Sequence, residues 1–226
     1  MMELLELLER NDRHVSEFSN DRFDAVQDGQ SPGLVTVCCS DSRVLQDELI
    51  TNETPGDVFT VGVIGNRVCE RTDDGATVSG DVLYPLVHAG TATAAVIGHT
   101  GCGAVTATYQ DLTDGVDEPD GIQYAIDLLK DRLAPGVDAL PDGLDEESAI
   151  NHLVEYNVDR QVELLLESDD VPDDVRVAGL VYDFQNVYSD DRGRLQLINV
   201  NGSRTPDAIE RNTPALSSRF NRLWSY

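Results

Sequence analysis

The chain has 226 residues, of which 40% are hydrophobic, enough for one substantial core and within the range of a single α/β domain. Its 42 acidic residues outnumber its 16 basic ones and leave a formal net charge of −26. A field of this sign repels phosphate backbones and anionic lipid surfaces, so nucleic acids and membranes are excluded as expected partners.

The surplus of acid is combined with a scarcity of lysine. Lys130 is the only lysine, and aspartates crowd loops such as 73–75 and 189–194. This haloarchaeal-like composition is typical of proteins adapted to molar salt, where an acidic surface stays hydrated and its self-repulsion is screened. The alternatives are an acidic mesophilic protein or a disordered chain, and the long apolar segments between the acidic loops argue against disorder.

Residues 1–27 carry apolar side chains at helical spacing and predict an N-terminal arm of one or two amphipathic helices that lies against another surface. The segment lacks the basic stretch and cleavage site of a signal peptide, and no stretch is apolar for long enough to span a bilayer. We therefore expect a cytoplasmic, reducing location. Four cysteines in such a chain favour metal binding or catalysis over disulfides.

Residues 28–226 alternate between strand and helix patterns, which predicts an α/β fold. Together with the N-terminal arm they are expected to form a single domain, residues 1–226. We expect a mainly parallel sheet of about four strands plus an antiparallel edge strand, flanked by helices. The predicted strands cover residues 34–40, 57–66, 93–100, 175–184 and 194–200. The predicted helices cover 79–90, 121–134 and 145–168, with a further one beginning in 101–109, and 134–143 is expected to be a loop.

Potential metal ligands stand at the ends of two of these strands. The first strand ends at Cys39 and the third at His99, with Cys102 three residues later. The carboxyl ends of parallel strands share one edge of a sheet, so these ligands are expected to converge. Two thiolates and one imidazole suit Zn²⁺, and three protein ligands leave the fourth tetrahedral position open, as catalytic zinc sites do.

Asp41 and Arg43 follow Cys39 closely. Asp41 is expected to accept a hydrogen bond from water on the zinc, and Arg43 to hold Asp41 ionised by a bidentate pair. A purely structural ion pair is the alternative for these two. Because neighbouring side chains on a strand point to opposite faces, Cys38 is expected to pack as a small hydrophobe rather than join Cys39 at one metal.

The motifs CSDSRV (39–44) and GHTGCGAV (98–105), in this order and at this separation, strongly resemble those of the β-class carbonic anhydrases. The resemblance implies one zinc ion per subunit, bound by Cys39, His99 and Cys102, with Asp41 and Arg43 as the catalytic dyad. It also implies a substrate pocket, in which Gln30 matches the glutamine of plant-type members. The other residues that match this pocket are Phe59, Ile64, Tyr84 and Gly103.

In those enzymes the Gln, Phe and Tyr come from the neighbouring subunit, so the resemblance implies a homodimer as the smallest active unit and leaves a tetramer open. The chain departs from the family pattern at Gly62 and Val63, where an Arg and an Asn are usual, and at Leu83, where many members have Glu. These departures affect hydrogen bonds around the site and the interface, whereas the zinc ligands are intact.

The resemblance implies reversible hydration of CO₂ to bicarbonate and a proton by zinc-bound hydroxide. One alternative keeps the zinc site and changes the substrate to CS₂ or COS. A second is a non-catalytic homologue that binds zinc or bicarbonate, and a third is a thiol redox or phosphatase-like enzyme that uses Cys39.

Overall fold

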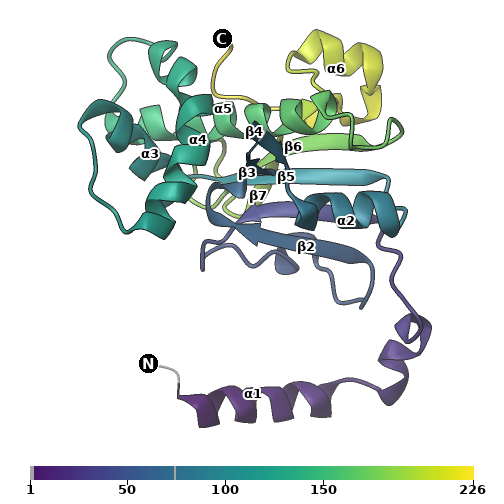
Figure 1. Cartoon of the computed structure of the whole chain (residues 1–226). Helices are drawn as coiled ribbons and strands as arrows, with labels where there is room; N and C mark the ends of the chain where they lie inside the picture. Colours follow the sequence, from purple (N-terminus) through teal and green to yellow (C-terminus); the bar gives the residue numbers. More distant parts are fainter. Residues whose placement is uncertain (1–2, 74) are drawn as a thin grey trace.

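The computed structural model describes residues 3–73 and 75–226, and a five-stranded sheet forms the centre of its α/β body (Figure 1). The strand order is β2-β1-β5-β6-β7, with β7 antiparallel to β6 and all other neighbours parallel. The predicted sheet of four parallel strands with an antiparallel edge strand is therefore confirmed. The strands are β1 (Leu34–Cys39), β2 (Val58–Val63), β3 (Cys69–Thr72), β4 (Gly75–Val78), β5 (Thr93–His99), β6 (Arg176–Asp183) and β7 (Arg194–Val200).

Helices cover both faces of the sheet, as predicted. The helices are α1 (Leu4–Glu17), α2 (Gly80–His88), α3 (Gly103–Thr113), α4 (Asp120–Asp138), α5 (Glu146–Glu167) and α6 (Pro206–Asn212). Val35 and Val37 of β1 and Val96 of β5 point to the same face of the sheet, where α2 and α5 bury them. On the opposite face, Ile209 of α6 packs against Leu197 of β7.

Two strand glycines let α5 lie close to the sheet. A Cβ atom at Gly98 would lie 2.8 Å from Val158 of α5, and one at Gly179 would lie 2.9 Å from the same residue. A methyl group at either position would push the helix away. This close approach brings the buried side of α5 to the loops that leave β2, β5 and β6.

One local prediction was wrong, and one element was missed. Residues 134–138 belong to α4 rather than to a loop, and Pro135 lies inside that helix. The helix continues because Leu133 and Gly136 are buried against its neighbours. Pro135 has no N–H to donate to the carbonyl group of Asp131, but Asp131 is exposed, so water can replace that hydrogen bond. The β3-β4 hairpin was not predicted, since its first strand reads CERT, with three exposed residues and no apolar alternation.

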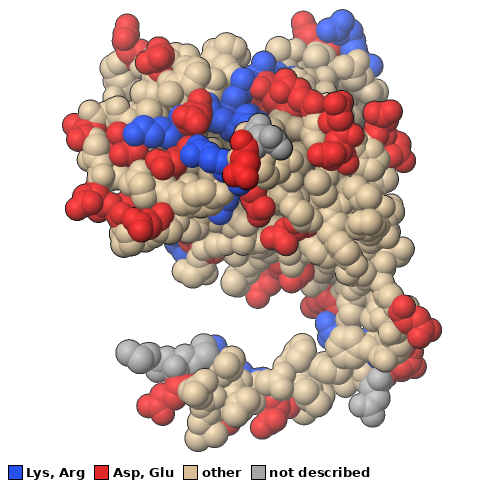
Figure 2. Space-filling view, viewed as in Figure 1, with Lys and Arg blue, Asp and Glu red and all other residues tan. Residues whose placement is uncertain are grey.

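The N-terminal arm is confirmed as the helix α1 followed by a 3₁₀ segment, Asn20–Val26. None of the residues of α1 is buried, and Leu4 and Leu8 are 81% and 61% exposed. Figure 1 shows α1 standing apart from the sheet, and Figure 2 shows the open space between this helix and the body of the molecule. Within the described part of the chain, no helix combines the length and the apolar character needed to cross a bilayer.

The C-terminal residues contact α5 through buried ion pairs. Arg222 lies 2.9 Å from Asp159 and 3.5 Å from Glu155, two carboxylates of α5 with no exposed surface. Glu155 also accepts hydrogen bonds from the Tyr188 hydroxyl at 2.8 Å and the Leu223 amide at 2.7 Å. One guanidinium thus serves two buried acids, and burial raises the pKa of Glu155 to about 7.

This pKa predicts that Glu155 makes the protein less stable as the pH rises. The folded state holds a proton that the unfolded state releases between its pKa of 4.5 and about 7, so the free energy of unfolding falls across this window. We expect the free energy of unfolding of wild type, measured relative to that of Glu155→Gln, to fall by on the order of 1–3 kcal/mol from pH 5 to pH 8. Urea unfolding of both proteins at constant salt measures this. Parallel pH curves for the two proteins would contradict the prediction.

Candidate metal centre

Three donor atoms converge at the carboxyl edge of the sheet, where the sequence predicts them. Cys39 ends β1 and His99 ends the neighbouring strand β5, while Cys102 is the residue that precedes the first turn of α3. Their donor atoms all lie within 4.8 Å of one another, and all three residues are buried. The structure therefore brings the three predicted ligands together.

The spacing of these atoms fits a tetrahedral zinc ion. The two sulfur atoms lie 3.8 Å apart. Two sulfurs bound at about 2.3 Å with tetrahedral angles would lie about 3.8 Å from each other. His99 donates its Nδ1–H to the carbonyl oxygen of Thr100 at 2.9 Å, and its buried Nε2 has no hydrogen-bond partner among the described residues. An unpartnered buried nitrogen beside two thiols is the arrangement that a metal ion would satisfy.

The surroundings of the Cys39 sulfur favour its negatively charged thiolate form. The Gly65 amide donates to it at 3.4 Å, and the Cys102 thiol is its hydrogen-bond partner. Hydrogen bonding from Cys102 lowers the pKa of Cys39, and the same hydrogen bond raises that of Cys102. By contrast, burial raises the pKa of Cys38 to about 12, and this residue has no exposed surface, which agrees with its predicted packing role.

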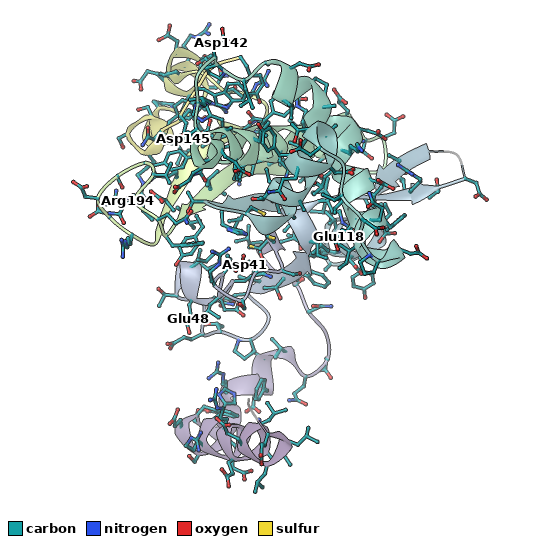
Figure 3. All side chains as sticks on the ribbon, turned by 90° about the vertical axis from the view of Figure 1, so that its left-hand side faces the viewer. Asp41, Glu48, Glu118, Asp142, Asp145 and Arg194 are labelled. Carbon is teal, nitrogen blue, oxygen red and sulfur yellow. The ribbon has the colours of Figure 1, made fainter. Side chains whose placement is uncertain are left out.

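Asp41 and Arg43 form the predicted bidentate pair beside the cluster; Asp41 is labelled in Figure 3. Arg43 donates from Nε to Oδ1 at 2.8 Å and from Nη2 to Oδ2 at 2.6 Å. The Arg43 hydrogen bond is the main reason that the pKa of Asp41 falls to about 2. Oδ2 also lies 3.5 Å from His99 Nε2, so an ionised oxygen faces the space that the three ligands enclose.

An aromatic ring that sequence reasoning missed supports this group. Phe184, which follows β6, stacks on the His99 ring with centroids 5.8 Å apart. The guanidinium carbon of Arg43 lies 4.8 Å from the centre of the same ring. The ring thus contacts both a ligand and the partner of Asp41. Its sequence neighbours predicted only the end of a strand and carried no signal of this role.

The predicted pocket residues separate into two groups. Ile64 follows β2 at the metal edge, and Gly103 begins α3 directly after Cys102. Phe59 and Tyr84 contact each other, with ring centroids 6.2 Å apart, but Phe59 pairs with Val35, at the opposite half of β1. Four residues of strand correspond to about 13 Å. Gln30 is exposed and precedes β1, so it belongs to that far edge as well.

The parallel sheet and the open Cys₂His cluster at its carboxyl edge together define an α/β protein with a zinc site of the catalytic type. The family model described as carbonic anhydrase matches residues 34–188, most of the chain and all three ligands. The chain belongs to the β-class carbonic anhydrase family.

Comparisons with individual proteins agree with this assignment. The chain is 34% identical over 109 residues to carbonic anhydrase 2 of Mycobacterium tuberculosis, which covers 48% of this chain and 47% of that protein. It therefore matches about half the length of this curated relative. Among solved structures, it is similar to a Coccomyxa β-carbonic anhydrase in complex with acetazolamide (TM-score 0.71, 24% identity, 93% and 92% of the two chains covered). It is also similar to a tetrameric β-carbonic anhydrase from Sordaria macrospora (TM-score 0.66, 20% identity, 86% and 94% covered).

Proposed function

We propose that this protein interconverts CO₂ and water with bicarbonate and a proton, with zinc as its cofactor. The observation that carries the proposal is the open cluster of Cys39, His99 and Cys102 with the ionised Asp41 beside it. Membership of the carbonic anhydrase family supports it. A zinc ion at this position would supply an acidified water as the nucleophile near neutral pH.

The side chains around the cluster supply orientation and charge. Asp41 is an acceptor that stays ionised at all pH values well above 2, so it can hold one hydrogen of the attacking water and leave a lone pair free for the carbon of CO₂. Arg43 fixes both carboxylate oxygens and thereby the direction of that acceptor. The proton that the reaction releases must then pass to buffer, since bicarbonate leaves as an anion.

We also infer that the substrate pocket is completed by a second copy of the chain. Gln30, Phe59 and Tyr84 lie toward the edge opposite the metal ligands of their own chain, which supports a role for them at the metal site of another subunit. The exposed leucines of α1 supply an apolar surface for the same contact. The tetrameric relative from Sordaria macrospora supports an oligomer. A homodimer is the smallest assembly that meets these requirements.

A cytoplasmic location at high salt is the setting that we propose for this reaction. All four cysteines are buried and free, which suits a reducing compartment. Acidic side chains are spread over the surface in Figure 2, in keeping with a net charge of −26. Molar salt would screen the repulsion among these charges and also the repulsion of the product bicarbonate.

Stopped-flow measurement of CO₂ hydration in molar KCl tests the proposal. Protein stripped of metal by a chelator and then reloaded with Zn²⁺ should regain hydration in proportion to its zinc content. The same preparation in dilute buffer should be less active, since unscreened repulsion loosens the fold. Release of H₂S from COS assays the alternative substrate. Fully zinc-loaded protein that hydrates no CO₂ would show that the proposed activity is wrong.

A further inference from the structure

Helix α5 presents a row of buried amide side chains to the loops around the metal ligands. Asn151 accepts a hydrogen bond from the Gly101 amide at 2.9 Å, in the loop between His99 and Cys102. Gln161 accepts one from the Val68 amide at 2.8 Å. Asn157, which has no exposed surface, donates to the Gly65 carbonyl at 2.9 Å. Buried amides are costly unless they are paired, so each of them holds its loop in one place.

The loop that Asn157 contacts has a demanding backbone. Gly65 and Asn66 are consecutive residues in the left-handed region, with φ of 73° and 44°. A Cβ atom at Gly65 would lie 2.5 Å from a methyl carbon of the fully buried Leu129, so a side chain there would force Leu129 to shift. A left-handed non-glycine residue costs roughly 1 kcal/mol, and such a turn persists only when its surroundings hold it. In this turn, the Gly65 N–H points to the sulfur of Cys39 at 3.4 Å.

The amides that hold the turn form a chain. Gln161 donates to the Asn157 side-chain oxygen at 3.1 Å, which fixes the orientation of the Asn157 amide. The Asn157 nitrogen then donates to the Gly65 carbonyl and, at 3.2 Å, to the side-chain oxygen of Asn66. Thus both left-handed residues are anchored by one side chain that is 92 residues from Gly65 in the sequence.

We propose that Asn157 is a positioning residue for the metal centre: it holds the turn in which the Gly65 amide donates to Cys39. An N–H group directed at a thiolate withdraws electron density from it, so the sulfur gives less charge to a bound metal. The proposal rests on the zinc site of the proposed function and not on CO₂ as the substrate. Asn157 acts through backbone geometry and touches neither metal nor substrate.

The test measures the metal centre directly. In protein loaded with Co²⁺, the thiolate-to-cobalt charge-transfer band of Asn157→Ala should move to lower energy, because Cys39 loses its amide donor. Competition with a chelator should show roughly 10- to 100-fold weaker zinc binding, the usual cost of losing a partner around a metal ligand, because the turn that holds the Cys39 sulfur in place is no longer fixed. Asn199→Ala is the matched control. Asn199 is equally buried on β7 and hydrogen-bonds to Asp159 at 2.6 Å and to the Gly202 amide at 2.8 Å.

The control separates positioning from general damage to the fold. Asn199→Ala should lose stability but keep the wild-type band and zinc affinity. If folded Asn157→Ala also keeps both, the proposal is overturned. Should Asn157→Ala fail to fold, Asn157→Ser, which retains a hydroxyl donor, decides by the same two readouts with a smaller expected shift. Zinc-loaded wild type that fails to hydrate CO₂ would refute the proposed function and leave these readouts unaffected.

Discussion

Replacing Asp41 by Asn should lower CO₂ hydration by roughly 100-fold or more while zinc binding is kept, in line with the usual contribution of a positioned acid-base group. The Asp41 carboxylate accepts both hydrogen bonds of the Arg43 fork and still presents Oδ2 3.5 Å from His99 Nε2. An amide has one oxygen in place of two. If that oxygen faces Arg43, the amide nitrogen faces the site as a donor, and the attacking water loses its acceptor.

The control for this substitution is Asp111→Asn, which removes a carboxylate paired with Lys130 at 2.5 Å, away from the metal ligands. It should leave the turnover number unchanged. Zinc content of each protein is measured alongside the stopped-flow rates. If the Asp41→Asn protein carries a full complement of zinc and hydrates CO₂ at the wild-type rate, then Asp41 and Arg43 form only a structural ion pair.

The ligand set was predictable because it depends on local rules. Parallel strands end at one edge, so Cys39 and His99 were expected to converge there, and the structure adds that β1 and β5 are direct neighbours. Alternation along β1 separated Cys38 from Cys39. The pairing of Asp41 with Arg43 joins residues two positions apart, and such a contact needs no knowledge of the fold.

The supporting residues were not predictable, because their roles arise from contacts between distant segments. Asn157 lies in a segment for which the sequence predicts a helix and nothing more, and its contact with Gly65 appears only when α5 approaches the sheet over Gly98 and Gly179. Phe184 likewise meets His99 only in the folded chain. The extension of α4 through Pro135 was missed for a related reason, since burial of Leu133 and Gly136 outweighed a local stop signal.

The placement of Gln30 far from the metal ligands of its own chain leads to the second large effect, which appears only in mixed dimers. If Gln30 serves the metal site of the partner, Gln30→Ala and Cys39→Ser should each be poorly active alone but should complement each other. In a mixed dimer, the Cys39→Ser chain supplies an intact Gln30 to the intact metal site of the Gln30→Ala chain. Random pairing makes about half of the dimers mixed, each with one complete site, so about a quarter of wild-type activity should return.

A second mixture provides the control for this experiment. Cys39→Ser combined with Asp41→Asn should show no recovery, because both substitutions damage the half of the site that each chain contributes with its own metal ligands. The two mixtures undergo the same dissociation and reassembly, and they differ only in whether the lesions fall on the same half or on opposite halves. Equal recovery in both would point to refolding rather than complementation. No recovery in the first mixture, with mixed dimers present, would show that Gln30 does not act across the interface.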